Sequence, residues 1–341
     1  MGADEEDRTK VVSIVYGRRW RLESRLGAGG MGNVFRGFDL QENRPVALKT
    51  LGMHLADDPE FVKRFEREAQ LLARLKHKAL PAIHELSRHE GMPYFVMTLV
   101  EGKTLAELLA EKKKLIPRFV YSLLQQLSSV MAYLHARGVV HRDLKPENLM
   151  VDDAGRLSLI DFGISAQTNV TRLTLPGVAL GTPLYMAPES ITVGKATPSS
   201  DVYAMGLLAF TMLTGEHPFA REDRNGMRTR QVKEVPPAAS TVSAGVSVGI
   251  SKVISRALEK TPSARFATAG DFVEALRVAW GFEKLPGDEN TDEVTSDVAR
   301  TAPDLGLVGP MPTRNERAIN DESARPTDAH QRSTLLDESD D

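Results

Sequence analysis

The chain has 341 residues, of which 41% are apolar and 26% are charged, and its formal net charge is −3. This length and composition allow a globular body with sizeable hydrophobic cores. The sequence contains no cysteine, which excludes disulfides, thiolate zinc sites and a thiol nucleophile. No window holds eighteen uninterrupted apolar residues and the first residues are acidic, so we expect neither export nor a membrane span, and a cytoplasmic location.

The charge is unevenly distributed along the chain. Residues 285–341 hold five Arg, no Lys and fourteen Asp plus Glu, whereas the other 284 residues hold 38 basic and 32 acidic side chains. This last segment also lacks Phe, Trp and Tyr, so it cannot bury enough apolar surface to offset the entropy of ordering. We expect a disordered acidic tail at 282–341 and a flexible acidic segment at 1–15.

The tail has two interpretations, an acidic interaction or autoinhibitory arm and a solvated segment without a partner. In the rest of the chain, no basic cluster with interleaved aromatic residues occurs, and we therefore expect no nucleic-acid binding.

Between the two ends, the local patterns change from strand to helix. Short β-prone runs separated by turns predict antiparallel strands at 21–25, 34–39 and 46–51. An apolar stripe at helical spacing then predicts a helix at 60–76, and two further strand-like runs follow at 80–86 and 94–100. Beyond these, the patterns are mostly helical, at 104–110, 119–135, 201–214, 249–258 and 269–279. A small sheet-rich lobe, about 16–100, is thus expected before a larger helical lobe, about 101–281.

A glycine-rich segment, Gly27-Ala28-Gly29-Gly30-Met31-Gly32, lies between the first two predicted strands. Glycines let backbone N–H groups approach phosphate oxygens closely. The competing dinucleotide-binding fingerprint requires a helix directly afterwards and an acidic residue about twenty positions on. Here Val34 continues a strand and Lys49 stands near that later position. The pattern favours a nucleotide-binding hairpin, with an incidental glycine-rich turn as the alternative.

A lysine on the third predicted strand, Lys49, is by itself most often a surface charge. Its predicted partner is Glu68, which lies beside the apolar Ala69 and Leu72 on the helical stripe, on the opposite flank from Glu66. An ion pair between Lys49 and Glu68 would aim the ammonium at phosphate groups. Glu66 is the alternative partner.

The most specific signal is His141-Arg142-Asp143-Leu144-Lys145-Pro146-Glu147-Asn148, followed thirteen positions after Asn148 by Asp161-Phe162-Gly163. Phosphoryl transfer needs a carboxylate to orient or accept the hydroxyl proton, a cation on the moving phosphate, and an amide with a second carboxylate to hold magnesium. Asp143, Lys145, Asn148 and Asp161 would supply these groups in that order. The alternative is a polar turn followed by an unrelated Asp-Phe-Gly tripeptide.

Together these motifs resemble the eukaryotic-like (Hanks-type) Ser/Thr protein kinase family, and several segments are most similar to its bacterial members. The resemblance covers about residues 16–280. It implies an α+β bilobal protein kinase fold, with a small β-rich N-lobe carrying one key helix and a larger, mainly helical C-lobe. It also implies ATP with magnesium, manganese being the alternative metal, and protein substrates with Ser or Thr acceptors.

The resemblance also assigns roles to individual residues. Its catalytic residues are Asp143, Lys145 and Thr182, and its metal ligands are Asn148 and Asp161. Its ATP-binding residues are Leu26, Gly27, Ala28, Gly29, Gly30, Met31, Gly32, Val34, Ala47, Lys49, Glu68, Met97, Thr98, Val100 and Met150. Among these, Ala47 and Met150 would sandwich the adenine, and Met97 would be the gatekeeper. Its supporting residues are His141, Arg142, Phe162, Glu189, Asp201 and Arg265.

The acceptor class follows from the same resemblance. Lys145 and Thr182 are typical of Ser/Thr-directed kinases, and residues 181–189 resemble the segment that docks the substrate. Arg142 resembles the residue that clamps a phosphorylated activation loop, but Ala166 stands where a second basic residue is usual, which leaves Arg64 to assist. The expected phosphosites are Thr174 and then Thr171, modified within a transient homodimer.

A pseudokinase scaffold, which would bind partners without turnover, is the alternative function. Pseudokinases commonly lose the strand lysine, the catalytic Asp or the metal Asp. This chain keeps Lys49, Asp143, Asn148 and Asp161, so the sequence favours an active kinase.

Overall fold

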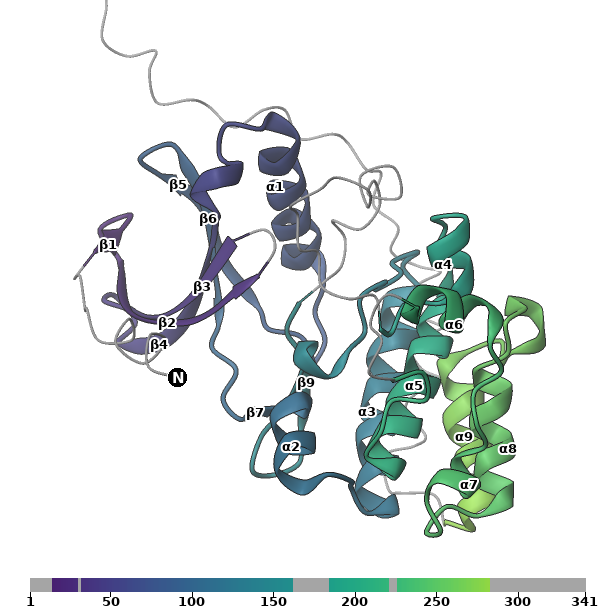
Figure 1. Cartoon of the computed structure of the whole chain (residues 1–341). Coiled ribbons are helices and arrows are strands. Elements are labelled where there is room, and N and C mark those ends of the chain that lie inside the picture. Colours follow the sequence, from purple (N-terminus) through teal and green to yellow (C-terminus); the bar gives the residue numbers. More distant parts are fainter. Residues whose placement is uncertain (1–13, 30–31, 162–183, 221–225, 283–341) are drawn as a thin grey trace, which may run out of the picture. The chain divides into compact units, whose positions relative to one another are not determined.

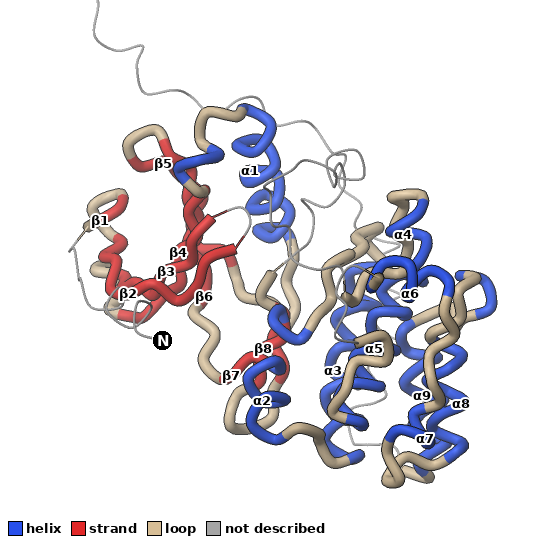
Figure 2. The backbone as a smooth tube through the Cα atoms, viewed as in Figure 1, coloured by secondary structure: helices blue, strands red, loops and turns tan. Residues whose placement is uncertain are grey.

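A computed structural model describes residues 14–29, 32–161, 184–220 and 226–282. Two lobes of different secondary structure follow one another along these residues, as Figures 1 and 2 show. The predicted acidic segments at the two ends of the chain lie almost wholly outside the described residues.

An antiparallel sheet of six strands forms the first lobe. In spatial order its strands are β1 (Val15–Tyr16), β2 (Trp20–Gly29), β3 (Gly32–Asp39), β4 (Arg44–Leu51), β6 (Met92–Thr98) and β5 (Ile83–His89). Because side chains alternate along a strand, neighbouring residues of β4 serve different faces. Val46 and Leu48 join Trp20 in a small core on one face, whereas Ala47 and Leu51 join the main core on the other.

One helix, α1 (Pro59–Arg74), covers the second face of this sheet. It begins with Pro59 in the first turn, and the Asp58 carboxylate caps it by accepting from the backbone N–H of Glu60 at 2.9 Å. Phe65, Ala69 and Leu72 recur at helical spacing and are buried in the same core as Leu51 and Phe95 of the sheet. This packing fixes the neighbouring Glu68 beneath the sheet.

The second lobe is mainly helical. Its longer helices are α2 (Leu105–Lys112), α3 (Pro117–His135), α5 (Pro198–Thr214), α8 (Val248–Ala257) and α9 (Ala269–Trp280). Shorter pieces are α4 (Pro188–Thr192), α6 (Met227–Lys233) and α7 (Ala239–Val242), and a small sheet contains β7 (Lys103–Thr104), β8 (Leu149–Val151) and β9 (Leu157–Leu159). Every residue of α5 from 200 to 213 is buried, so α5 is the central helix of this lobe.

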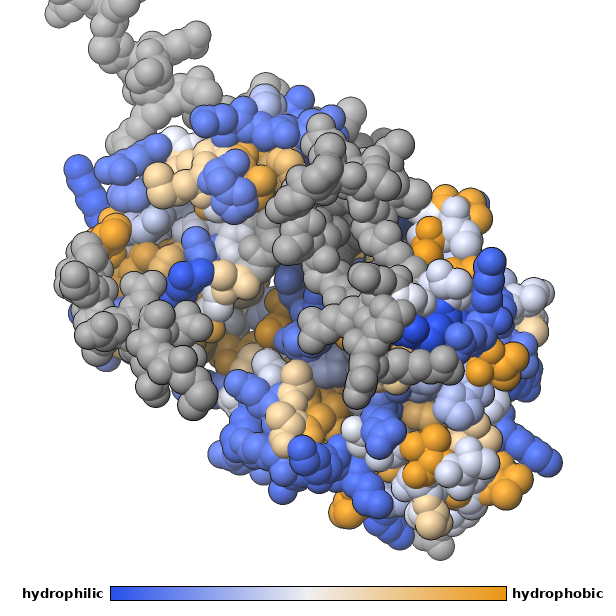
Figure 3. Space-filling model, viewed as in Figure 1, coloured by the Kyte–Doolittle hydropathy of each residue, from blue (hydrophilic) through white to orange (hydrophobic). Residues whose placement is uncertain are grey.

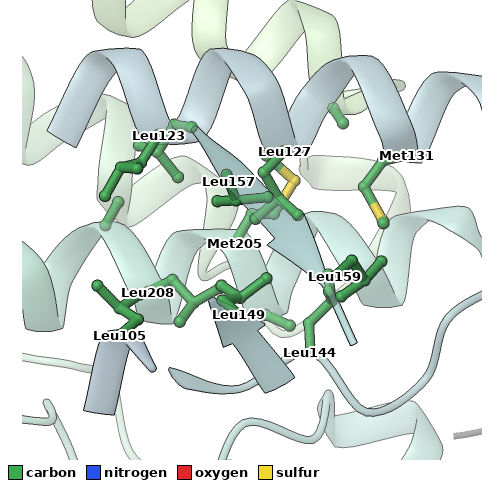
Figure 4. Close-up of a cluster of buried hydrophobic side chains, with 14 of the residues drawn as sticks. Leu105, Leu123, Leu127, Met131, Leu144, Leu149, Leu157, Leu159, Met205 and Leu208 are labelled. Carbon is green, nitrogen blue, oxygen red and sulfur yellow. The ribbon is translucent and has the colours of Figure 1, made fainter. Parts of the chain in front are cut away.

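The core of the helical lobe supports the segment between α3 and β8. Figure 4 shows Leu144 of this segment among leucines and methionines of α3, α5, β8 and β9. Leu149 and Leu159 face each other across the pair β8–β9. Apolar side chains therefore anchor the polar residues that lie on either side of Leu144.

The predicted order of elements is confirmed. The structure shifts the ends of the predicted strands and helices by a few residues in either direction; the helix predicted at 60–76, for example, is Pro59–Arg74. It also adds β1, the small sheet, α4, α6 and α7, which the sequence patterns did not predict. These additional pieces are two to seven residues long, too short for a periodic pattern to develop.

Candidate active site

The carboxylate of Asp201, near the start of α5, accepts hydrogen bonds from the backbone of the segment between α3 and β8. It is buried, and its Oδ2 accepts from the backbone N–H of His141 at 3.0 Å and from His135 Nε2 at 2.7 Å. Its Oδ1 accepts from the backbone N–H of Arg142 at 3.0 Å. One carboxylate thus fixes two successive peptide groups.

Arg142 needs that support because its φ is +73°, in the left-handed region that non-glycine residues seldom adopt. Such a conformation costs of order 1–3 kcal/mol and persists where the surroundings determine it. The bonds from Asp201 to the N–H groups of His141 and Arg142 supply this constraint. The turn places Asp143, the next residue, at the surface of the lobe.

His141 links this turn to Asp161. Its Nδ1 accepts from the backbone N–H of Asp143 at 3.3 Å, which leaves the proton on Nε2 to donate to the carbonyl oxygen of Asp161 at 2.6 Å. Burial lowers the pKa of His141, which keeps the ring neutral. His141 therefore positions two carboxylate-bearing residues and is not an acid or base in this arrangement.

Two polar side chains converge on Asp143. Lys145 Nζ donates to Asp143 Oδ2 at 2.7 Å, and Asn148 Nδ2 donates to the same oxygen at 3.0 Å and to the Asp143 backbone carbonyl at 2.8 Å. No hydrogen bond from the described residues reaches Oδ1. About 40% of the Asp143 side chain is exposed, so this second oxygen can meet an incoming hydroxyl.

Lys49 lies between two carboxylates that come from different lobes. Its Nζ is 2.9 Å from Glu68 Oε1 and 2.8 Å from Asp161 Oδ1. Burial disfavours the Lys49 ammonium, but Asp161 and Glu68 outweigh it and raise its pKa. Burial raises the pKa of Glu68, whereas for Asp161 the Lys49 ammonium outweighs burial and lowers the pKa. The alternative partner, Glu66, binds Arg88 instead.

The sheet residues expected around a nucleotide gather on one face. Ala47 and Lys49 are two residues apart on β4. Met97 of β6 pairs with Ala47, and Val34 of β3 pairs with Lys49. Figure 3 shows the surface hollowed between the two lobes. Of the other expected contacts, Leu26, Ala28 and Thr98 are exposed, and Val100 and Met150 are half-buried.

Two glycines of the first hairpin test whether a phosphate group fits there. A Cβ on Gly32 would lie 1.8 Å from the carbonyl oxygen of Thr50, so close strand packing requires that glycine. A Cβ on Gly27 would meet nothing within 4 Å, and the φ of Gly27 is not in the left-handed region. Contacts within the described protein do not require Gly27, which fits a backbone that a ligand approaches closely.

Asn148 and Asp161 fit the requirements of a hard divalent cation. Both nitrogen-bound hydrogens of the Asn148 amide point to Asp143, which turns its carbonyl oxygen the other way. The backbone N–H of Ile160 donates to the backbone carbonyl of Asn148 at 3.0 Å and holds Asp161 beside Asn148. Among the described residues, no group of three or more His, Asp or Glu could hold a metal alone. Magnesium needs only one or two such ligands when phosphates supply the rest.

Glu189, at the start of α4, is bound by a buried arginine of the chain near α9. Arg265 Nη1 and Nη2 donate to the two Glu189 carboxylate oxygens at 2.8 and 2.7 Å. Ser200 Oγ of α5 donates to the same carboxylate at 2.7 Å. Burial opposes ionisation, but Arg265 and Ser200 together lower the pKa of Glu189. The pair fixes the chain where it enters α4.

Several expected site residues lie outside the described residues: Gly30, Met31, Phe162, Thr171, Thr174 and Thr182. The structure also brings forward residues to which the sequence gave no role in the site. His135 shares Asp201 with the turn at His141 and Arg142, and Gln231 and His217 bind the backbone around Tyr185. A histidine just before a buried aspartate-bound turn carries no distinct sequence signal, since its partner is 66 residues away.

Comparison with known proteins identifies the family of this fold and site. A family model described as the protein kinase domain matches residues 20–280. The chain belongs to the protein kinase domain family. The resemblance to bacterial Ser/Thr kinases is also confirmed, because the similar curated proteins include such enzymes from Mycobacterium tuberculosis and Bacillus subtilis.

Two relatives and one solved structure illustrate the similarity. Serine/threonine-protein kinase PknL of M. tuberculosis is 36% identical over 262 residues, which cover 77% of this chain and 66% of PknL. Serine/threonine-protein kinase PrkC of B. subtilis is 32% identical over 285 residues, covering 84% of this chain and 44% of PrkC. The chain thus spans less than two thirds of these relatives. A crystal structure of the M. tuberculosis PknI kinase domain aligns with a TM-score of 0.63 and 27% identity, covering 79% of this chain and 98% of that one.

In the part of the chain that the structure describes, no helix has the length and apolar character needed to cross a bilayer.

Proposed function

We propose that the chain is an ATP-dependent Ser/Thr protein kinase, which transfers the γ-phosphoryl group of Mg-ATP to Ser or Thr hydroxyls of proteins. The observation that carries this proposal is the linkage of two charged clusters through His141. Asp143, Lys145 and Asn148 form one cluster, and Lys49, Glu68 and Asp161 form the other. The His141 ring joins them, since it contacts the backbone of both Asp143 and Asp161.

Each cluster supplies a part of phosphoryl transfer. Asp143 orients the acceptor hydroxyl through Oδ1 and receives its proton, while Lys145, 2.7 Å from Oδ2, neutralises charge that develops on the moving phosphoryl group. Lys49 binds the phosphates farther from the reacting bond, and Glu68 keeps its ammonium in place. Magnesium would bind Asn148 and Asp161 and supply electrostatic stabilisation; manganese is the alternative metal.

The substrate class and location rest on resemblance and chemistry. The relatives named as serine/threonine-protein kinases support Ser/Thr acceptors, as does Lys145 two residues after Asp143. ATP is abundant in the cytoplasm, which supports a cytoplasmic site of action. The pseudokinase alternative has no support among these observations, since Lys49, Asp143, Asn148 and Asp161 all have partners that orient them for catalysis.

The test uses the full chain with magnesium, labelled ATP and dephosphorylated casein. Asp143→Asn keeps the shape of the site but removes the carboxylate, so turnover should fall by about 10²- to 10⁴-fold with ATP affinity nearly unchanged. Asp161→Ala should instead weaken binding of the magnesium nucleotide. Asp153→Asn, at an exposed position after β8, is the control and should behave as the parent. Parent-like turnover in both Asp143→Asn and Asp161→Ala would overturn the assignment.

The same reaction tests autophosphorylation, which we propose occurs on Thr174 or Thr171 between two copies of the chain. Arg64 supports this proposal, because its Nη1 is buried without a hydrogen-bond partner among the described residues, while its Nη2 binds Glu60. A phosphothreonine would offer such a guanidinium oxygen acceptors. Phosphosite mapping should find phosphate on one of these threonines in the parent and none in Asp143→Asn. Both threonines bare in a fully active preparation would contradict it.

A further inference from the structure

The segment Leu184–Met186, which leads into α4, is held by side chains from outside the catalytic clusters. The ring of Tyr185 in its middle packs edge-on against His217, with 5.2 Å between centroids, and its hydroxyl is 3.5 Å from Thr211 Oγ1. Burial, with a smaller contribution from the Glu147 carboxylate, raises the pKa of Tyr185 to about 12. The ring of Tyr185 is thus fixed by two residues, His217 and Thr211, that lie outside the catalytic clusters.

Gln231 of α6 bridges the two carbonyl groups on either side of Tyr185. Its side chain is fully buried, and its Nε2 donates to the Leu184 carbonyl oxygen at 2.9 Å and also to the Met186 carbonyl oxygen. A primary amide has two N–H donors, and both are used here. An oxygen in the same place would face two carbonyl oxygens. Only the amide nitrogen suits this position, so Gln231 fixes both its own orientation and that of the segment.

His217 provides a second bond to the same segment. Its Nδ1 accepts from the backbone N–H of Phe219 at 3.3 Å, so its Nε2 carries the proton and donates to the Leu184 carbonyl oxygen at 2.9 Å. Burial lowers the pKa of His217 to about 4, so the ring is neutral at physiological pH. The Leu184 carbonyl thus accepts two bonds, one from each side chain.

These contacts continue to the ion pair at the start of α4. Lys260 Nζ donates to the Gln231 backbone carbonyl at 2.7 Å, and Arg265 Nη2 donates to the Lys260 backbone carbonyl at 3.1 Å. Arg265 in turn binds Glu189 through both carboxylate oxygens. The segment from Leu184 to Glu189 is therefore fixed at both ends by one continuous network.

We propose that Gln231 and His217 are positioning residues for the protein acceptor, acting through the backbone of Leu184–Met186. This inference rests on the proposed kinase function. A preorganised docking segment binds its ligand without a further ordering cost. Loss of Gln231 or of His217, the two clamp residues, raises the KM for the acceptor. The KM for ATP is unchanged, because the nucleotide contacts lie on Lys49 and the sheet.

The main test is Gln231→Glu, which keeps the side-chain shape and replaces the bridging donor with an acceptor. With casein as the acceptor, we expect its KM to rise about 10- to 100-fold, as for a small misplacement away from the chemistry. The KM for ATP and the ATP hydrolysis measured without casein should remain at the parent level. Gln70→Glu, at an exposed position of α1, is the matched control and should change neither KM.

A pair of His217 variants keeps the test decisive if Gln231→Glu fails to fold. His217→Leu removes the donor and should raise the casein KM, whereas His217→Gln can place an amide N–H near the position of Nε2 and should restore part of the affinity. Equal casein KM values for His217→Leu and the parent would overturn the proposal. So would a rise in the KM for ATP as large as that for casein.

Hydrogen exchange separates this inference from the kinase assignment. Amides of residues 184–190 should exchange at least about 10-fold faster in Gln231→Glu than in the parent, while amides of β6 keep the parent rate. Unchanged amide exchange at 184–190 would overturn the proposal that Gln231 fixes this segment. This measurement does not depend on turnover, so a parent that transferred no phosphate to any protein would refute the proposed function alone.

Discussion

Two cations of this chain, the partly buried Lys49 and the buried Arg265, bind carboxylates in different ways. Arg265 uses all five guanidinium N–H donors, two on Glu189 and three on the backbone carbonyls of Ser199, Glu259 and Lys260. Lys49 uses two of its three donors among the described residues, one on each of two carboxylates. The arginine is saturated by the protein, whereas the lysine retains bonding capacity.

The two cations also differ in how fully the neighbouring carboxylates balance their charge. Arg265 and Glu189 form a neutral pair, and the Arg265 side chain has no exposed surface. Lys49 faces both Glu68 and Asp161, which leaves an excess negative charge, and 45% of the Asp161 side chain is exposed. A saturated neutral pair has no affinity left for a ligand. The Lys49 cluster keeps a free lysine donor and an accessible carboxylate. It can therefore bind a phosphate through the lysine and a metal cation through the carboxylate.

The comparison predicts that Arg265 matters chiefly for stability. Arg265→Met leaves the partly buried Glu189 carboxylate without its counterion, and the free energy of unfolding should fall by about 3–5 kcal/mol. Urea denaturation measures this change. Arg156→Met, which removes an exposed arginine paired with Asp152, is the control and should cost less than about 1 kcal/mol. Equal losses in the two variants would show that the buried pair is not structurally special.

Lys49 should matter chiefly for turnover. Lys49→Met removes the cation that we propose binds phosphate, and we expect kcat to fall by about 10²- to 10³-fold, the usual effect of losing one electrostatic group at a reacting centre. Its midpoint of thermal unfolding should change less than that of Arg265→Met. Lys103→Met disrupts an exposed pair with Glu111 and should leave kcat unchanged. A Lys49→Met enzyme that kept parent activity but unfolded readily would reverse the contrast.

The sequence predicted long elements and missed short ones for a physical reason. The stripe Phe65, Ala69 and Leu72 repeats at helical spacing because one face of α1 packs on the sheet. The helix α5 is buried on all sides, so its apolar length predicted it, without an amphipathic pattern. The strands β7 and β8 are two and three residues long, and only their partners in the folded chain define them.

The candidate site divides in a similar way. Asp143, Lys145 and Asn148 were identifiable because their spacing within one turn brings them together locally. Gln231 was not, because its partner Leu184 is 47 residues away and its bonds are to backbone carbonyls, which any residue offers. His217 was not identifiable either, because its Nε2 donates to the backbone carbonyl of Leu184, which is 33 residues away. The roles proposed for Thr171, Thr174 and Thr182 stay predictions, because these residues lie outside the described part of the chain.

A third cation, Lys260, sharpens the comparison, because it is half-buried and no carboxylate of the described residues forms an ion pair with it. Its Nζ donates to the Gln231 carbonyl at 2.7 Å and lies 4.5 Å from the centroid of the Phe219 ring. Burial first, and then the Arg265 charge, lower the pKa of Lys260 to about 8, against the weaker opposing effect of Glu234 and Glu259. The charged form of Lys260 is therefore destabilised by burial. For Lys49 and Arg265, the carboxylates that bind them offset this effect.

This destabilisation of the Lys260 charge should appear as a pH dependence of stability. Below pH 8 the lysine is protonated in both the folded and the unfolded chain, so its contribution is constant. Between about pH 8 and 10.5 the unfolded chain binds more protons at this site than the folded chain, so stability rises with pH. The Tm of the parent minus that of Lys260→Met should therefore increase between pH 7.5 and 9.5. Because Lys260 is only half-buried, we expect about 1–2 °C. The same difference for Lys252→Met, an exposed lysine of α8, should stay flat, and a Lys260 difference that stayed flat or fell with pH would contradict the assignment.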